Sequence, residues 1–381
     1  MTKLSALAQR LSVLFFFGFL VILCVGSILS RGKVFSEKEN RALADFPSPT
    51  LSSYINGSFM DGVDGFAADH LFFRDSWTAL HIRLRLACGA SSVNGVYFLE
   101  NRYADRTTDI PAAGLDQSVA AVKSFAQSTK IPVYMMLVPS AAGIYFDDLS
   151  PLEPNADQKS IIYGVYEALG KDVIPLDAYS VLYSARDEYI YYRNDMHWTP
   201  LGAYYAYTAA AAKMGNGAVK LSNYDIRHVS DGFYGSYYAQ APLAKYEADS
   251  IDLYTPKNGV SVESVEVYDT NENVRTYQTL YFSRYLEGLN KYNYYLGAPS
   301  PLMKITTNSE SGKKLLVVKD SFAQCFLPYL TQHYSSITVV DLSCSDESFS
   351  ALADGDYDQI LLLYGIGDFA GGFGGKLDAA K

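Results

Sequence analysis

The chain of 381 residues has little of what metal centres and disulfide-stabilised folds are made from. It contains four cysteines, at positions 24, 88, 325 and 344, and no Cys-x-x-Cys pair. Cys24 lies inside an apolar run, which leaves three cysteines in the remainder of the chain. Neither a zinc site nor a disulfide framework is therefore predicted, and we expect no metal and no cofactor.

Positive charge is also scarce. Lys and Arg number 31 against 41 Asp and Glu, so the formal net charge is -10. An acidic surface repels phosphate backbones, and nucleic acid is therefore not expected as a partner. Charged residues make up only 19% of the chain and hydrophobic residues 49%, which argues against wholesale disorder and allows a sizeable core.

Tryptophan is rare whereas tyrosine is abundant, with 2 Trp and 32 Tyr. A tyrosine ring offers a flat apolar face and a hydroxyl group, which suits sugar-like ligands. Half-buried strands rich in tyrosine account for the same composition. The tyrosine content alone therefore does not identify a ligand.

An uncharged apolar segment runs from Leu11 to Leu29. It is long enough for a helix that crosses a bilayer, which needs about 20 residues. Basic residues stand on both sides of it, so the flanking charge does not determine its orientation. We expect residues 1–30 to form a single-pass anchor in the cell membrane, with the rest of the chain extracytoplasmic. A cleaved signal peptide is the alternative, although no clear cleavage site follows the segment.

Three regions are predicted. After the anchor, residues 31–85 form a polar stalk and a helical lead-in. Residues 86–381 alternate between apolar, strand-like runs and helix-like segments, which is typical of an α/β fold with a parallel sheet. Clear strands are expected at 131–138, 314–318 and 360–364, and a helix at 321–333. Between about 216 and 301 the alternation breaks into short, tyrosine-rich β-like pieces, which we interpret as an insertion.

A serine follows one of these strands directly, in Lys319-Asp320-Ser321-Phe322. This position lies at the carboxyl edge of the sheet, where open α/β folds bind ligands. A backbone N–H at the start of a helix also stabilises developing negative charge. Ser321 is thus a candidate acyl-transfer nucleophile. The alternative is that its hydroxyl only caps the helix.

Asp195 and His197 provide a candidate for the base. Residues two apart on an extended segment point to the same side, and a carboxylate beside an imidazole can orient the ring and stabilise the imidazolium. A metal site or a strand-end hydrogen bond could use the same pair, but no third metal ligand is evident. The last strand ends in a glycine-rich segment, Gly365 to Asp368, where the backbone could approach a ligand or form a tight turn.

The segment Arg193-Asn194-Asp195-Met196-His197-Trp198-Thr199 resembles the signature of the DHHW family, with Met196 in place of the first His. Alginate O-acetylation proteins have a similar D-x-H-W element. Further matches follow one another along the exported part of the chain: Ser36-Glu37-Lys38-Glu39-Asn40-Arg41, Phe73-Arg74-Asp75, Asn94-Gly95-Val96-Tyr97-Phe98, Asp231-Gly232-Phe233-Tyr234-Gly235 and Lys319-Asp320-Ser321-Phe322.

This resemblance implies an SGNH-hydrolase-like parallel sheet with helices on both faces, in a permuted chain order because the nucleophile comes last. It implies Asp195, His197 and Ser321 as the catalytic triad. Two departures are evident: Lys319 replaces the glycine of the usual G-D-S, and the last strand end lacks the asparagine that helps an oxyanion hole. Two further groups are assigned from positions in or beside these motifs: Gly365, Gly367, Asp320 and Trp198 to oxyanion or supporting roles, and Arg193, Tyr192 and Tyr234 to substrate binding.

The expected function is O-acetylation of a cell-surface polysaccharide through an acyl-Ser321 intermediate. The resemblance implies that a multi-pass membrane acyltransferase supplies the acyl group. Two alternatives stay open. The protein could be a carbohydrate esterase that passes the acyl group to water, or a non-catalytic protein that binds or assembles a polysaccharide.

Overall fold

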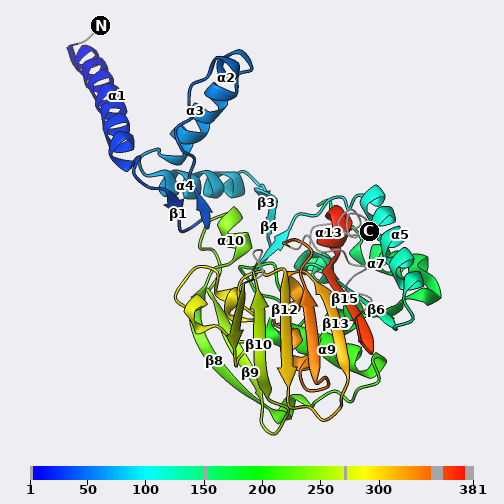
Figure 1. Ribbon diagram of the computed structural model, residues 1–381. Helices are drawn as coiled ribbons and strands as arrows, with labels where there is room; N and C mark the ends of the chain where they lie inside the picture. The colour runs from blue at the N-terminus through cyan, green and yellow to red at the C-terminus, as the bar shows by residue number, and fades with distance from the viewer. Residues whose placement is uncertain (1–2, 149–152, 270–272, 345–354, 374–381) are drawn as a thin grey trace. The chain divides into compact units, whose positions relative to one another are not determined.

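The computed structural model describes residues 3–148, 153–269, 273–344 and 355–373 (Figure 1). The chain forms two compact units. The first comprises Met1–Val93 and Tyr238–Ala244, and the second comprises Asn94–Tyr237 and Lys245–Lys381.

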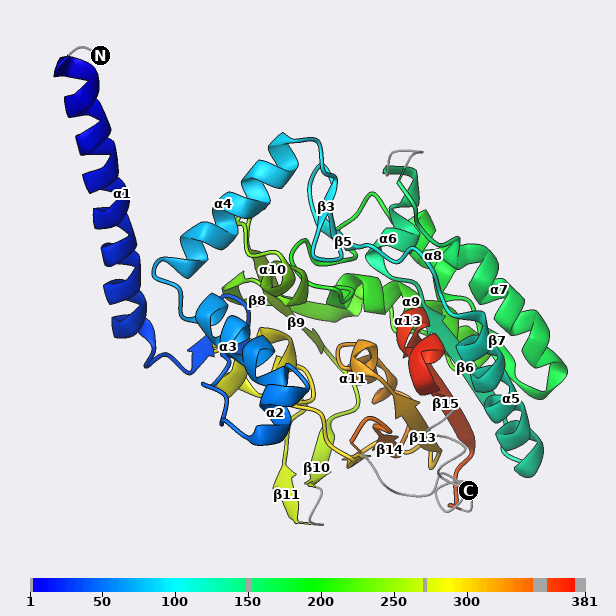
Figure 2. The ribbon, with the colours of Figure 1, turned by 90° about the horizontal axis from the view of Figure 1, so that it is seen from above.

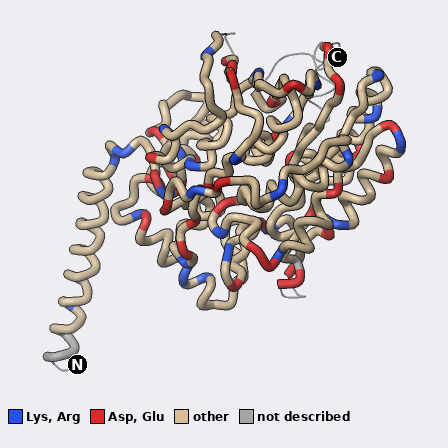
Figure 3. The backbone as a smooth tube through the Cα atoms, turned by 90° about the horizontal axis from the view of Figure 1, so that it is seen from below, with Lys and Arg blue, Asp and Glu red and all other residues tan. Residues whose placement is uncertain are grey.

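The first unit begins with helix α1, Lys3–Ser30. Its apolar part, Leu7–Ser30, is long and apolar enough to cross a membrane, a test that a signal sequence near the N-terminus also passes. Figure 3 shows that charged residues are almost absent from this helix. The expected apolar helix is therefore present.

Helix α4, Arg74–Ala87, begins beside the carboxyl-terminal half of α1. The Phe72 backbone N–H donates to the Ser27 hydroxyl over 3.0 Å, and a side chain at Gly26 would overlap the ring of Phe72. Further along, the rings of Phe19 and Trp77 meet edge to face, with centroids 6.5 Å apart. The two helices are thus held together by aromatic packing.

The segment expected to be a stalk contains regular structure. Its elements are β1 (Phe35–Ser36), β2 (Arg41–Ala42), α2 (Leu51–Ile55), α3 (Ser58–Asp69) and α4, and β3 (Ser92–Val93) follows it. Asp69 at the end of α3 pairs with Arg41 over 2.5 Å, and Arg74 at the start of α4 pairs with Glu39 over 2.7 Å. The Arg41 guanidinium lowers the pKa of Asp69 to about 2. Two of the family-like segments, 36–41 and 73–75, therefore meet in an ion-pair network.

The second unit is built on an eight-stranded sheet in the order β11-β10-β12-β14-β13-β15-β6-β7 (Figure 1). These strands are β6 (Val133–Val138), β7 (Ile174–Leu176), β10 (Val262–Tyr268), β11 (Val274–Tyr277), β12 (Leu302–Thr307), β13 (Lys314–Lys319), β14 (Ser336–Val340) and β15 (Gln359–Gly365). From β14 to β7 the neighbours are parallel, whereas β12, β10 and β11 pair antiparallel. The α/β class is confirmed, but the sheet is mixed rather than wholly parallel.

Burial explains the two halves of the sheet. Every residue of β6 is buried, as expected for a strand covered on both faces. In β12, buried residues alternate with exposed or half-buried ones, so one face of this strand is open to solvent. The parallel half is thus the core of the unit.

The predicted insertion does not form one separate piece. Its strands β8 (Tyr224–Phe233) and β9 (Asp249–Pro256) pair only with each other, while β10 and β11 extend the main sheet. In a mixed sheet an antiparallel hairpin needs only a short connection, so these strands can be added at the edge without a crossover helix. A small antiparallel pair, β4 (Val96–Phe98) with β5 (Tyr103–Asp105), precedes the sheet.

The helices of the second unit gather mainly around the end of the sheet formed by β6 and β7 (Figure 2). They are α5 (Ala112–Ser128), α6 (Ala141–Ile144), α7 (Gln158–Leu169), α8 (Ala178–Ser184), α9 (Pro200–Lys213), α11 (Leu327–Leu330) and α13 (Ile366–Asp368), while α10 (Ser236–Gln240) spans the boundary between the units. The single helix expected at 321–333 is wrong. A 3₁₀ turn, Ser321–Ala323, leads instead to the short α11, where Pro328 lies in the first turn, the position in a helix that tolerates proline.

Candidate active site

Ser321 and His197 reach the same place from different parts of the chain. Strand β13 ends at Lys319, and Ser321 opens the 3₁₀ turn that follows it. His197 stands just before α9, whose start is capped by the Thr199 side chain and has Pro200 in its first turn. Residues 193–197 form a bend, closed by the antiparallel bridge between Tyr191 and Trp198, and not the extended segment that was expected. The cap fixes where the helix begins after this bend.

Three side chains form a continuous hydrogen-bonded row. The Ser321 Oγ lies 2.7 Å from His197 Nε2, and His197 Nδ1 lies 2.5 Å from Asp195 Oδ1. Asp195 is 4% exposed and His197 8%, so the row is shielded from water at its carboxylate end. An arrangement of this kind lets an imidazole accept the serine proton while the carboxylate stabilises the resulting cation.

The Asp195 carboxylate is held by the backbone as well as by His197. Its Oδ2 accepts from the Ser236 N–H over 2.8 Å, and its Oδ1 accepts from the His197 N–H over 3.0 Å. A Cβ at Gly235 would overlap the carboxylate, which explains why the smallest residue stands there. Burial disfavours the charged form, but His197 and these two N–H groups hold the pKa of Asp195 below its ordinary value. The carboxylate is therefore ionised at neutral pH.

Tyr292 covers one face of the His197 imidazole, a contact that the sequence did not indicate. Its ring stacks on His197 with centroids 3.9 Å apart and an interplanar angle of 11°. The Phe322 ring approaches His197 from the edge at 5.2 Å. The Tyr292 hydroxyl lies 3.3 Å from the buried Cys325 sulfur, and burial raises the pKa of that thiol to about 12. Cys325 is thus a packing residue, and Tyr292 limits the rotation of the imidazole.

Asp320, and not Ser321, caps the turn that carries the serine. Its carboxylate accepts from the Phe322 N–H over 2.9 Å and from the Gly365 N–H over 2.5 Å. The Ser321 hydroxyl is consequently left for His197. Burial and the charge of Asp368 raise the pKa of Asp320 to about 7, against the effect of the two N–H donors.

Trp198 also supports this turn. It is fully buried and donates its indole N–H to the Phe322 carbonyl over 2.9 Å. Its ring stacks on Phe326 and meets Phe322 edge to face. Trp198 therefore holds Phe322, the residue after the serine, as its predicted supporting role requires.

The two glycines predicted to help an oxyanion hole, Gly365 and Gly367, have different surroundings. The Gly365 N–H donates to Asp320 and is not available to an oxyanion. Gly365 thus supports the site in two other ways: it holds the Asp320 carboxylate, and it allows the close approach of the Phe322 ring. Gly367 is exposed in the short α13, and its role stays a prediction. Within the described residues, the Ser321 N–H donates to no acceptor. It is therefore a candidate oxyanion donor.

The predicted substrate-binding residues do not line the described pocket at Ser321. Tyr192 has no exposed surface and packs edge to face against Phe233 and Tyr292, so its assignment to substrate contact is wrong. The Arg193 guanidinium lies over the ring of Tyr189, 4.9 Å from its centroid. Tyr234 is half-buried beside Gly235, and its contact with substrate stays a prediction.

Asp249 of β9 holds the segment that carries Asp195. It accepts from the N–H groups of Arg193 and Asn194 over 2.8 and 2.7 Å, and from the Tyr189 hydroxyl. No local motif surrounds Asp249, so the sequence did not mark it as part of the site.

A pocket of about 290 Å³ opens at Ser321. Its lining includes Lys319, Asp320, Asp341 and Asp368. Lys319, which replaces the usual glycine, pairs with Asp341 over 2.8 Å although both are buried. Burial opposes ionisation of Asp341, but Lys319 and Ser343 hold its pKa below the ordinary value. Among the described residues, no group of three or more His, Cys, Asp or Glu could hold a metal.

Comparison with protein families matches residues 85–340 to the DHHW protein family. The chain belongs to this family. A comparison with curated protein sequences finds no match. Solved structures share its fold. One is a DHHW family protein from Eubacterium siraeum, which is 23% identical, with a TM-score of 0.66; the match covers 75% of this chain and 96% of that chain. Another is Bacillus cereus PatB1, which is 20% identical, with a TM-score of 0.63; the match covers 72% of this chain and 96% of that chain. PatB1 with a sulfonyl adduct matches at 18% identity, covering 72% and 95%, with a TM-score of 0.63.

The predicted DHHW family is thereby confirmed, and the α/β fold is the one seen in these solved structures. In this DHHW protein the first histidine of the signature is Met196. The Met196 N–H donates to the Ser236 hydroxyl over 3.1 Å. The replacement therefore leaves the row from Asp195 to Ser321 intact.

Proposed function

We propose that this DHHW protein is a serine acyl-transfer enzyme in which Ser321 carries the acyl group. The hydrogen-bonded row from Asp195 through His197 to Ser321 is the observation that supports this. His197 takes the Ser321 proton as Oγ attacks the acyl carbonyl, and it then returns that proton to the leaving group of the donor. In the second half, His197 takes a proton from the acceptor hydroxyl, which attacks the acyl-serine, and Ser321 recovers its proton.

The acceptor that we infer is a hydroxyl of a cell-surface polysaccharide, and the acyl group is acetyl. This step rests on the similarity of the Asp195-Met196-His197-Trp198 segment to the D-x-H-W element of alginate O-acetylation proteins. A multi-pass membrane acyltransferase is the proposed source of the acyl group, on the same similarity. No cofactor is required, because both half-reactions transfer only a proton and an acyl group.

Two alternatives have observations of their own. The pocket at Ser321 opens on solvent and Ser321 is half-buried, so water could take the acyl group, as in an esterase. The absence of an asparagine at the last strand end, together with the engaged Gly365 N–H, favours a non-catalytic polysaccharide-binding or assembly protein.

Turnover of an activated acetyl ester, with and without an oligosaccharide, separates these functions. We expect acetylated sugar in preference to acetate from the wild-type protein, and neither from Ser321→Ala. Ser343→Ala is the matched control, because Ser343 lines the same pocket but donates to Asp341 instead of His197. Acetate alone would favour the esterase, and equal turnover by Ser321→Ala would exclude Ser321 as the nucleophile.

We further propose that α1 anchors the protein in the cell membrane with the second unit outside the cytoplasm. Contacts of α4 with α1 support the anchor, because they place aromatic side chains beside the end of the apolar helix. The exposed apolar residues of this region follow one face of α4: Phe73, Trp77, Leu80 and Leu84. Such a face suits the membrane interface, where tryptophan is enriched.

Protease added to intact cells tests this location. The second unit should be digested from outside, whereas a cytoplasmic marker protein should survive until lysis. Survival of the second unit in intact cells would contradict the proposed orientation. A mature chain that starts after α1 would contradict the anchor.

A further inference from the structure

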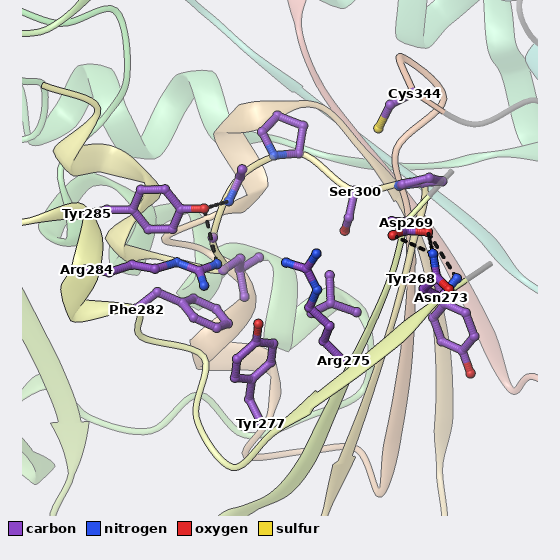
Figure 4. A pocket seen from close by; sticks show the side chains of 16 residues that line it. Tyr268, Asp269, Asn273, Arg275, Tyr277, Phe282, Arg284, Tyr285, Ser300 and Cys344 are labelled. Carbon is purple, nitrogen blue, oxygen red and sulfur yellow. Dashed lines mark hydrogen bonds between the residues drawn. The ribbon is translucent and has the colours of Figure 1, made fainter. Parts of the chain in front are cut away.

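A second pocket lies beside strands β10 and β11 (Figure 4). Its volume is about 260 Å³, and its lining comes from β10 and β11 with the flanking Asp269 and Asn273, from the segment 282–301, and from Cys344. The sheet register places the two pockets on one edge: Val318 of β13 is beside Val340, Val340 is beside Leu302, and Leu302 is beside Tyr268. Tyr268 lines the second pocket, and Ser321 follows β13 by two residues.

The two pockets are neighbours along this edge. Pro299 lines both of them, and Cys344 of the second pocket follows Ser343 of the pocket at Ser321. Three strand spacings separate β13 from β10, which corresponds to about 14 Å at ~4.8 Å per strand. A ligand that reaches both pockets must therefore be longer than a single sugar unit.

Two arginines and one aspartate give the described lining of the second pocket an excess of positive charge. Arg275 of β11 and Arg284 both line it, and within the described residues neither forms an ion pair. Figure 4 shows the Arg275 guanidinium directed into the pocket between Tyr277 and Ser300. The acidic residue of the lining, Asp269, accepts hydrogen bonds from the Asn273 backbone and side chain over 3.0 to 3.2 Å.

Aromatic rings form a further part of the wall. Tyr277 and Phe282 meet edge to face with centroids 4.9 Å apart, and Arg284 lies over the rings of Phe282 and Tyr285. The Tyr285 hydroxyl accepts from Arg284 over 3.3 Å, which orients that guanidinium. Flat rings with hydroxyl groups suit the faces of sugars, and guanidinium groups suit carboxylate and phosphate groups.

We propose that this pocket binds an acidic sugar unit of the acceptor polysaccharide, at a distance along the chain from the unit that Ser321 acylates. Arg275 and Arg284 bind its carboxylate or phosphate group, and the aromatic wall packs against its ring. The proposal rests on the proposed function only in taking the ligand to be the acceptor. In a protein with a net charge of -10, this local positive charge selects acidic polymers that the rest of the surface repels.

Binding is measured by calorimetry on the Ser321→Ala protein, so that no turnover is needed. Three probes are compared: a uronic acid oligosaccharide, the same oligosaccharide reduced to the neutral sugar, and an oligosaccharide that bears phosphate groups. We expect an acidic probe to bind at least tenfold more tightly than the neutral one, and Arg275→Gln or Arg284→Gln to raise its Kd by on the order of tenfold. Arg227→Gln is the matched control, because Arg227 is an exposed arginine of β8 outside the pocket.

Of the two acidic probes, the one that binds more tightly shows whether the pocket prefers a carboxylate or a phosphate group on the sugar. Preference for either group supports the proposal. Equal Kd values for acidic and neutral probes would overturn it, as would equal effects of Arg275→Gln and Arg227→Gln. Thermal unfolding of each variant checks that the fold is retained. Hydrolysis of an activated acetyl ester by the protein with Ser321 intact is measured separately. Failure of that reaction counts against the proposed function and leaves the binding result standing.

Discussion

Replacing Tyr292 with leucine should slow acyl transfer about 5- to 30-fold, whereas phenylalanine should leave the rate within about twofold. The Tyr292 ring lies 3.9 Å from the buried His197 ring and nearly parallel to it. When His197 takes the Ser321 proton, it becomes a cation against an aromatic face. Stacking of this kind contributes about 0.5–1.5 kcal/mol, and a desolvated cation–π contact about 2 kcal/mol. A loss of about 1–2 kcal/mol in the transition state gives the expected rate change.

The phenylalanine variant keeps the ring and removes only the hydroxyl, whose partner is the Cys325 sulfur at 3.3 Å. The leucine variant removes the ring and leaves space in the core, because Tyr292 is only 5% exposed. We expect a loss of about 1–3 kcal/mol in the free energy of unfolding for leucine, and less for phenylalanine. Denaturant unfolding of both variants measures this.

Kinetics with an activated acetyl ester separate a role at the imidazole from general loosening. In a His197→Ala background the further change Tyr292→Leu should have almost no effect on the remaining rate, because the contact that it removes no longer exists. The reasoning is refuted if phenylalanine slows the reaction as much as leucine does. It is refuted equally if the leucine effect is unchanged without His197.

Three further changes test the surroundings of the serine. His197→Ala and Asp195→Ala should each lower turnover by on the order of a thousandfold, and adding Ser321→Ala to either should change little, since the groups act together; effects that multiply would contradict this. Gly235→Ala should lower turnover at least ~tenfold, because the added methyl displaces the Asp195 carboxylate; a rate equal to wild type in the same ester assay would contradict this. The raised pKa of Asp320, about 7, predicts stability that is fully present below about pH 4 and is lost as pH rises through 7. Asp320→Asn should remove that dependence, so the difference in unfolding free energy between variant and wild type should change between pH 4 and pH 8; a constant difference would contradict the assignment.

The strands of the parallel half were predictable because each is a nearly continuous apolar run. The expected strand at 131–138 corresponds to β6 at Val133–Val138, and that at 360–364 to β15 at Gln359–Gly365. The place of β10 and β11 in the same sheet was not predictable. Their side chains follow no long apolar run, and their partners are set by pairing between distant segments.

The meeting of Asp195, His197 and Ser321 in one hydrogen-bonded row was predictable from the segments that carry them, but its surroundings were not. Tyr292 reaches His197 from a turn about a hundred residues later, and only packing reveals which of 32 tyrosines does so. Tyr192 was assigned to the substrate because it stands beside the motif. Neighbouring side chains of an extended segment point to opposite sides. The position of Tyr192 next to the motif therefore did not show whether its ring faces the pocket or the core.

The central claim is that Ser321 is a nucleophile activated by His197. Mass spectrometry of peptides after treatment with phenylmethanesulfonyl fluoride tests it most directly. The account predicts one sulfonyl group on the peptide that contains Ser321. It also predicts none in Ser321→Ala and a rate at least ~100-fold lower in His197→Ala. A wild-type protein that stays unmodified, or that is modified equally fast without His197, would contradict the account.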